Sequence, residues 1–254
     1  MKRLYAAMLA GVFLCCTGCD EKTELEWETP DVWKPDAEVT RTKRLADKKK
    51  NPEYARVLST ESAKLGWDRI KRYQRDTDTG RDLYLKMAGS DFNMCWFFDP
   101  DNYNSYYGWA VVYGMRAESE NASTEVELFL TNSDRMFAMA AEHDIPSDEA
   151  AAFHMDWANL CNGLGAFYDQ AGEPQKAAQH LDKARLFLEK ILKQSPDNGR
   201  ACFLMSANCF YRKDIPQAKK YAAKAAEHGF AIPDDYRKEL DAAIRVFTSP
   251  RSRY

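Results

Sequence analysis

The stretch NGLGAFYDQAGEPQKAAQHLDKARLFLEKIL, residues 162–192, decides the fold that the sequence predicts. It predicts two helices separated at Gly172-Glu173-Pro174, because glycine often ends a helix and proline is favoured in the first helical turn. Small residues let the two antiparallel helices approach closely, and larger ones fill the space between neighbours. The small residues are Gly165, Ala177 and Ala184, and the larger ones are Leu164, Tyr168 and Leu181. The stretch therefore predicts a pair of packed helices.

A second stretch, CFLMSANCFYRKDIPQAKKYAAKAAEHG at residues 202–229, repeats this pattern. Both stretches resemble the tetratricopeptide repeat, a helix–turn–helix unit of 34 residues. The second copy is degenerate, with Lys213 where the turn glycine belongs and Cys209 where the tyrosine belongs. The resemblance implies an all-α fold in which antiparallel helix pairs stack into a solenoid. The positions that match in the second copy are Met205, Ser206, Ala218, Ala222 and Ala225.

Two earlier copies open at Leu65-Gly66-Trp67 and Tyr107-Gly108-Trp109, so the resemblance covers about residues 59–229. The intervals of 42 residues from Gly66 to Gly108 and 41 from Gly165 to Ser206 predict second helices about two turns longer than usual. The 57-residue interval from Gly108 to Gly165 fits the repeat poorly. Val126–Glu142 is therefore expected to form an elongated or non-repeat helix, and we expect about eight helices in all.

The first 19 residues, MKRLYAAMLAGVFLCCTGC, resemble the signal of bacterial lipoproteins, which ends at a lipid-accepting cysteine, here Cys19. Leu4–Leu14 forms an apolar core too short to span a bilayer, and Thr17-Gly18 supplies small residues before the cleavage point. Cys16 stands where the motif has an aliphatic residue, so cleavage without lipidation is the alternative. The stretch FNMCWFFDPDNYNSYYGWAVVYG, residues 92–114, also resembles bacterial lipoproteins that carry such repeats. These resemblances imply lipid anchoring in the bacterial cell envelope, on the periplasmic face if the organism is Gram-negative.

The chain divides into four parts at the level of sequence. Residues 1–19 are the signal, residues 20–57 a flexible linker, residues 58–229 the repeat domain, and residues 230–254 a C-terminal helix and tail. The linker is rich in charge and proline and has no helical apolar stripe. Trp27 and Trp33 are unusual in a linker; we favour their docking on the folded body over a role as a partner-binding peptide.

Composition excludes some functions. The net charge of −3 and the lack of a basic patch argue against nucleic-acid binding.

Cys202 and Cys209 lie seven residues apart on one expected helix, too far for a disulfide. Cys161 and Cys202 are the remaining plausible pair, but free buried thiols are the favoured interpretation for all four cysteines of the body, Cys95 included. No metal site and no cofactor are predicted.

The resemblance implies a concave groove lined by the inner helix of each pair. Its aromatic and amide side chains suit an extended peptide or helix of another envelope protein. The Lys and Asn pair with which chaperone-binding members of the family hold a terminal carboxylate is absent. The predicted groove residues are Trp67, Lys71, Asn102, Ser105, Trp109, Tyr113, Asn159, Asn162, Asp169, Arg200, Phe203, Phe210 and Tyr211, with packing in the core as the alternative for Trp67, Trp109 and Phe203.

Enzymatic function has weak support in the sequence. The best constellation is His143-Asp144 with His154 and Asp156, and it includes no nucleophile or glycine-rich loop. The sequence therefore favours a non-enzymatic, membrane-anchored platform for protein–protein interaction. The alternatives are a helical lipoprotein that binds or hydrolyses a small molecule, and a structural spacer.

Overall fold

The computed structural model describes residues 51–76, 81–120 and 123–248, and within them every regular element is an α-helix. The first four are α3 (Pro52–Arg75), α4 (Arg81–Phe98), α5 (Tyr103–Ser119) and α6 (Ser123–Ala140). The others are α7 (Ser147–Gln170), α8 (Pro174–Gln194), α9 (Gly199–Tyr211), α10 (Ile215–Glu227) and α11 (Asp234–Thr248).

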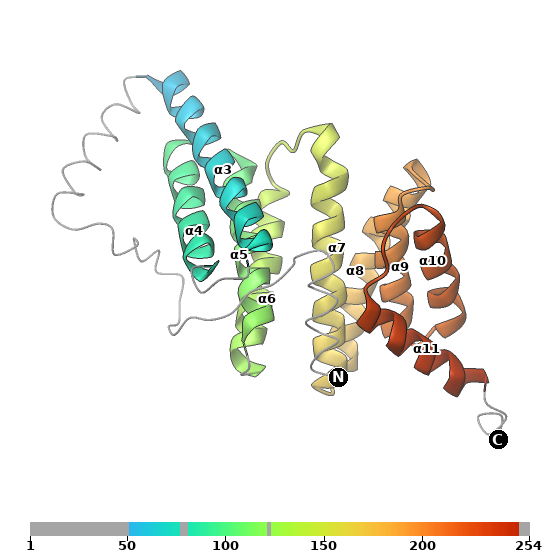
Figure 1. The fold of residues 1–254 in the computed structure, drawn as a ribbon. Coiled ribbons are helices and arrows are strands. Elements are labelled where there is room, and N and C mark those ends of the chain that lie inside the picture. The colour runs from blue at the N-terminus through green and yellow to red at the C-terminus, as the bar shows by residue number, and fades with distance from the viewer. Residues whose placement is uncertain (1–50, 77–80, 121–122, 249–254) are drawn as a thin grey trace.

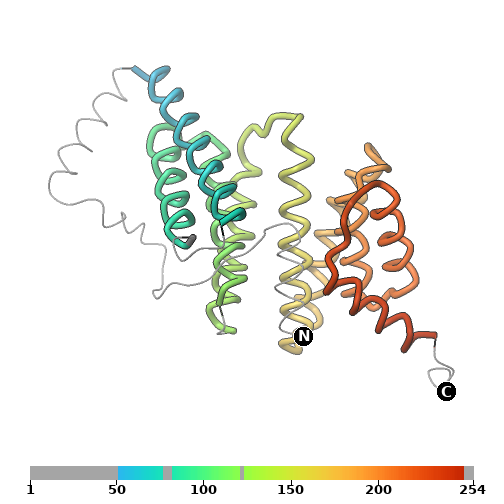
Figure 2. The backbone as a smooth tube through the Cα atoms, in the orientation of Figure 1, coloured from blue at the N-terminus to red at the C-terminus, as the bar shows by residue number. Residues whose placement is uncertain are grey.

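The helices pack as successive pairs. α3 packs with α4, α5 with α6, α7 with α8 and α9 with α10, and α11 packs on α10 (Figure 1). The backbone trace shows the pairs following one another from α3 to α11, so that the array is elongated (Figure 2). The prediction of an all-α helix-pair solenoid is therefore confirmed.

Glycines mark the closest contacts within the array. A Cβ atom added to Gly165 of α7 would lie 2.5 Å from Cγ of Leu181 on α8. A Cβ atom on Gly66 of α3 would lie 2.7 Å from the ring of Phe92 on α4, and one on Gly108 of α5 would lie 2.2 Å from the same ring. Only glycine permits these approaches. This explains why a glycine recurs at the same place in three of the repeat copies.

The first described helix begins earlier than the sequence predicted. The Asn51 side chain caps α3 by accepting a hydrogen bond from the Tyr54 backbone amide at 3.1 Å, and Pro52 suits the first turn. The expected end of the linker at residue 57 is therefore wrong, because residues 52–57 are helical. The rest of that linker, the signal and Cys19 lie outside the described residues.

The poorly fitting 57-residue interval has a simple origin. Gly108 lies five residues after Tyr103, where α5 begins, whereas Gly165 lies 18 residues after Ser147, where α7 begins. The expected helix Val126–Glu142 is α6, the ordinary second helix of the α5 pair. α8 has 21 residues and α10 has 13, a difference of about two turns.

The C-terminal end of the array is closed by α11. Tyr236 of α11 is fully buried and packs edge-to-face against Phe203 and Phe210 of α9. The expected C-terminal helix is thus present, although the final residues 249–254 are outside the described part of the chain. Cys95, Cys161, Cys202 and Cys209 are buried and free, as the favoured interpretation had it. None of the described helices is long and apolar enough to cross a membrane.

Candidate functional site

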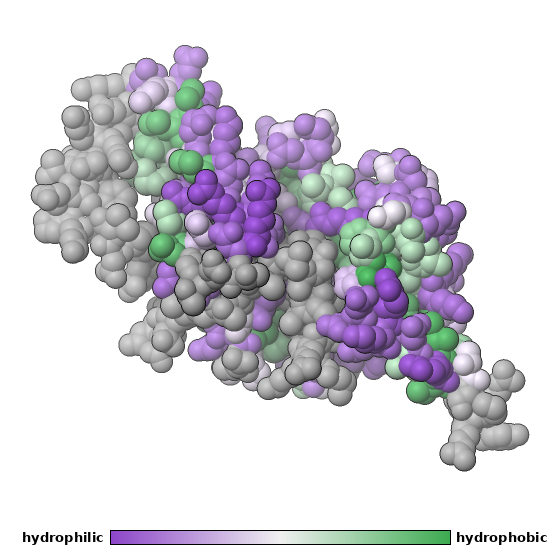
Figure 3. All heavy atoms as spheres, in the orientation of Figure 1, coloured by the Kyte–Doolittle hydropathy of each residue, from purple (hydrophilic) through white to green (hydrophobic). Residues whose placement is uncertain are grey.

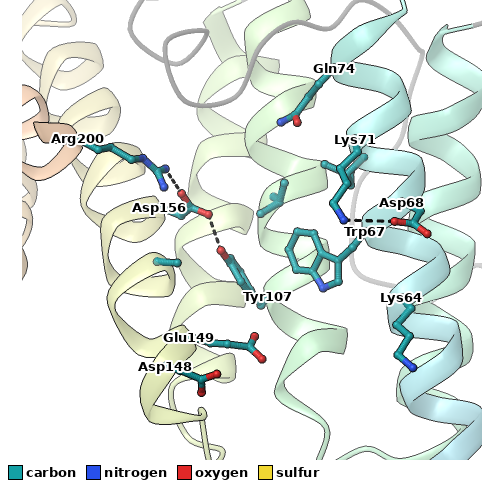
Figure 4. A pocket seen from close by; sticks show the side chains of 13 residues that line it. Lys64, Trp67, Asp68, Lys71, Gln74, Tyr107, Asp148, Glu149, Asp156 and Arg200 are labelled. Carbon is teal, nitrogen blue, oxygen red and sulfur yellow. Dashed lines mark hydrogen bonds and ion pairs between the residues drawn. The ribbon is translucent and has the colours of Figure 1, made fainter. Parts of the chain in front are cut away.

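An open cleft of about 710 Å³ lies between α3 and α7, over α5, and Arg200 of α9 completes it (Figure 4). α3 contributes six side chains, which are Lys64, Trp67, Asp68, Ile70, Lys71 and Gln74. α5 contributes Tyr107 and Val111, and α7 contributes Asp148, Glu149, Ala152 and Asp156. All four helices are first members of their pairs, so the cleft runs along one face of the array.

Aromatic rings form the floor of the cleft. The rings of Trp67 and Tyr107 lie 4.8 Å apart between centroids, and Trp67 also packs edge-to-face on Phe92. The indole Nε1 of Trp67 donates a 2.9 Å hydrogen bond to Oδ1 of Asn104 on α5. Trp67 is only partly buried, and a partly buried, well-oriented indole is a typical anchor for a bound peptide.

Asp156 ties three of the helices together at one side of the cleft. Its carboxylate accepts a hydrogen bond from the Tyr107 hydroxyl and forms an ion pair with Arg200 (Figure 4). The Asp156 side chain is 14% exposed and that of Arg200 is 28% exposed, so solvent screens the pair only partly. Burial, followed by the charge of Asp156, raises the pKa of Tyr107 well above its ordinary value, so this hydroxyl remains a donor.

The α3 wall of the cleft carries basic and amide groups. Lys64 pairs with Glu61 at 2.6 Å and Lys71 pairs with Asp68 at 3.3 Å, both along the exposed surface of the helix. Exposed pairs of this kind contribute little free energy, so both ammonium groups can turn to a ligand. The C-terminal half of α3 presents a hydrophilic surface (Figure 3).

The α7 wall is acidic. Asp148 and Glu149 lie in the first turn of α7, where the positive end of the helix dipole stabilises carboxylates. The Tyr103 hydroxyl donates a hydrogen bond to Glu149. Burial and this hydrogen bond raise the pKa of Tyr103, so the phenol stays protonated beside the carboxylate. The cleft therefore has an acidic wall and a wall with two lysines, on either side of an aromatic floor.

These groups are suited to binding through hydrogen bonds, ion pairs and aromatic contact. Lysine and carboxylate groups pair with charged side chains, and Gln74 offers both a donor and an acceptor to a peptide backbone. Among the described residues, no group of three or more His, Cys, Asp or Glu side chains could hold a metal ion.

The structure brings together only part of the predicted groove. Trp67, Lys71 and Arg200 line the cleft. Four other predicted groove residues are buried in the core, so the prediction is wrong for them: Ser105 is 1% exposed, Asn159 3%, Asn162 2% and Phe203 1%. They face neighbouring helices and cannot reach a partner.

The remaining predicted residues do not line the cleft, and their side chains make other contacts. Trp109 donates a hydrogen bond to Asn93 of α4 and packs against Tyr113. Asn102 caps α5 and donates a hydrogen bond to the Ser59 hydroxyl of α3. The others are Asp169, which pairs with Lys213 at 3.1 Å, and Phe210 and Tyr211, which pack against each other in α9.

The constellation considered for catalysis is used in separate contacts. The His143 ring stacks on Tyr106, with ring centroids 5.0 Å apart. Nδ1 of His154 lies 2.6 Å from the Ala150 carbonyl oxygen, and its ring packs against Phe187. Asp156 is engaged by Tyr107 and Arg200, as described above.

Sequence reasoning missed several residues that line the cleft, namely Lys64, Gln74, Tyr107, Asp148 and Glu149. A signal for the α5 residues existed, because Tyr103, Tyr107 and Val111 recur every four residues and so share one face of the helix. In the sequence, Asp148 and Glu149 follow Pro146-Ser147, and acidic residues at this place are typical of a helix start. That role is correct, and the same first turn places them at the cleft.

Comparisons with protein-family models, curated proteins and solved structures find no match for this chain. The residues of the cleft are therefore the basis on which a function can be assigned.

Proposed function

We propose that this protein is a non-enzymatic binding platform of the bacterial cell envelope, in which the solenoid holds a peptide segment of another envelope protein. One observation carries the proposal: the first helices of four successive pairs line a single open cleft with aromatic and charged side chains. Peptide recognition by helical solenoids uses concave surfaces of this kind. The spacing of the four tetratricopeptide-like copies, which centre on Gly66, Gly108, Gly165 and Ser206, supports the same proposal.

The proposed location rests on the N-terminal sequence. Lipidation of Cys19, followed by removal of residues 1–18, would anchor the solenoid to a membrane by more than one acyl chain, which is what stable anchoring needs. A tethered platform meets membrane-bound partners at a raised effective concentration, so a modest affinity in the cleft is enough for assembly. No nucleic acid and no cofactor are part of this proposal.

The partner is chemically constrained by the cleft. The α7 wall offers Asp148 and Glu149 to a basic group, and the α3 wall offers Lys71 to an acidic group. Trp67 between them provides the apolar area that a bound aromatic or aliphatic side chain would cover. We therefore expect a segment with a basic group on one side of an apolar anchor and an acidic group on the other side.

The test is site-specific photo-crosslinking in the native cells. A photoreactive amino acid at Gln74 in the cleft should capture one defined protein through one defined segment. The same group at Lys190, an exposed position on α8 that does not line the cleft, serves as the matched control. Equal capture from both positions, or capture of no protein from Gln74, would overturn the proposal and favour a structural spacer.

A further inference from the structure

The charges of the cleft are ordered along its length. Figure 4 places Asp148 and Glu149 at one end, across from Lys64, and places Lys71, Gln74 and Arg200 toward the other end. The first end is acidic, since two carboxylates face one lysine there. The second end carries Lys71 and Arg200, paired with Asp68 and Asp156 respectively, so its charges balance and it is less negative than the first end. A segment that fills the whole cleft should therefore have its basic part at the first end and its acidic part at the second.

The chain itself contains a segment with this order of charges immediately before α3. Residues 39–50 hold six basic side chains and one acidic one, whereas residues 20–38 hold eight acidic and two basic ones. The acidic part also contains Trp27 and Trp33, the aromatic residues that were unexpected in a linker.

The covalent connection gives this segment the correct direction. Asn51, where the chain enters α3, lies 13 residues before Lys64 on the same helix, so it is about 20 Å from Lys64 on the side away from Lys71. Trp33 is 18 residues before Asn51 and can reach up to about 60 Å from it. Lys71 lies only about 30 Å along α3, so the acidic part can reach it while the basic part passes Asp148 and Glu149.

We propose that the cleft is occupied in cis by residues 24–50 of the same chain, with the basic part beside Asp148 and Glu149 and the Trp27–Trp33 part beside Trp67 and Lys71. This inference rests on the proposed function, because it takes the same cleft as the binding site. A segment joined by a short linker is present at millimolar effective concentration, which is enough for weak surface pairs to hold it.

The inference has a consequence for the anchored protein. While the segment is docked, the distance between Cys19 and the helical body is shortened. An external partner must displace the segment to occupy the cleft, and displacement frees about 100 Å of extended chain. Partner binding and the reach of the body from the membrane are thereby coupled.

The test uses the purified chain from residue 20 to residue 254, with the photoreactive amino acid at Gln74. Trypsin should release residues 23–41 as one peptide, because Lys34 is followed by a proline. We expect this peptide to be crosslinked to position 74 within one molecule, with a yield that does not depend on protein concentration. The same group at Lys190 should give about tenfold less of this product, since that position does not line the cleft in which the segment docks.

Charge variants distinguish docking from chance proximity. Lys71→Glu should lower the intramolecular yield about fivefold, because an attraction becomes a repulsion, whereas Lys190→Glu should leave it unchanged. Changing Glu26, Glu28 and Asp31 to Lys in the Lys71→Glu background should restore it, with the yield read from the shorter tryptic peptides that the new lysines create. Lys71 is 62% exposed, so the substitution does not disturb the core.

Three results would overturn the inference. They are equal yields from Gln74 and Lys190, crosslinks that join two copies of the chain and rise with concentration, and yields insensitive to Lys71→Glu. Each of these would leave the proposed function standing, because partner capture in cells is measured separately. Conversely, the experiment in cells could capture no partner while the purified chain still forms intramolecular crosslinks. That pair of results would refute the binding platform and support the cis docking.

Discussion

The ring of Phe92 lies so close to the backbone of Gly108 that a Cβ atom on the glycine would stand 2.2 Å from Cδ1 of the ring. The opposite side of the same contact is Gly66, whose Cβ would lie 2.7 Å from Cε1 of that ring. Phe92 of α4 is fully buried between the two helices that carry these glycines. This one ring therefore sets the spacing of α3 and α5, the wall and floor of the cleft.

Gly108→Ala should destabilise the fold by about 1–3 kcal/mol, the usual cost of forcing an extra methyl group into a packed core. The free energy of unfolding can be measured by urea denaturation followed by circular dichroism. Gly114→Ala on the same helix is the control, because its Cβ would meet only Ser133 Oγ at 3.6 Å. That variant should be neutral or slightly more stable, since alanine favours the helix. Equal losses for both variants would contradict the packing argument.

Asn162 should matter more to stability than Asn159, although both are buried in α7. Asn162 donates a hydrogen bond to the Leu204 carbonyl at 2.9 Å and accepts one from Asn208 at 2.8 Å, which joins α7 to α9. Nδ2 of Asn159 has no hydrogen-bond partner. Asn162→Ala should cost about 2–3 kcal/mol because it also leaves the Asn208 donor without that acceptor. Asn159→Ala should cost clearly less, and a larger loss for Asn159→Ala in the same denaturation assay would refute the assignment.

The contacts of the Asp156 carboxylate with Tyr107 and Arg200 should contribute to the free energy of unfolding. Asp156→Ala leaves both the Tyr107 hydroxyl and Arg200 without their acceptor, so it should destabilise the protein by about 1–3 kcal/mol. Tyr107→Phe alone should cost about 1 kcal/mol. Since both changes remove the same hydrogen bond, the double variant should lose less than the two single losses combined. Strict additivity in a double-mutant cycle would show that the hydrogen bond contributes nothing.

Asp91 should make stability depend on pH in the α3–α4 pair. Burial, partly opposed by Arg69 at 2.8 Å, raises the pKa of Asp91 to about 6. Because the folded pKa is above the ordinary value of 3.8, this group favours folding below pH 4, and that contribution is lost as the pH rises to about 6. Relative to Asp91→Asn, the native chain should lose roughly 1 kcal/mol across this window, since solvent screening reduces the effect. Denaturation midpoints of the native chain and Asp91→Asn between pH 4 and 7 measure this loss. If the native chain keeps or increases its stability relative to Asp91→Asn as the pH rises, the prediction is contradicted.

The fold was predictable because its determinants are local. The turn at Gly172-Glu173-Pro174 and the small residues at Gly165, Ala177 and Ala184 specify a close helix pair within about 30 residues of sequence, and the glycine spacing then locates the other pairs. The start of α3 was missed by six residues because the charged run Lys48-Lys49-Lys50 obscured the Asn51 and Pro52 start signal.

The face that each helix turns to the cleft was harder to predict. α5 is apolar nearly all round, since it packs against α3, α4 and α6, and its pattern therefore does not distinguish one face from another. The prediction chose Trp109, two residues beyond Tyr107, and two residues turn the helix by about 200°. On α7 the error was along the helix. The cleft uses Asp148–Asp156, upstream of the predicted groove residues Asn159, Asn162 and Asp169, because the later half of α7 is covered by α8 and α9.

The most direct test of the binding platform is the affinity of the captured partner segment for the purified chain. The segment that crosslinks to Gln74 in cells would be synthesised, and its dissociation constant measured by isothermal titration calorimetry against the native chain, Trp67→Ala and Lys190→Glu. The account predicts that Trp67→Ala weakens binding at least about tenfold, as expected for an aromatic anchor, while Lys190→Glu binds like the native chain. Equal affinity for the native chain and a folded Trp67→Ala variant would contradict the claim that this cleft is the binding site.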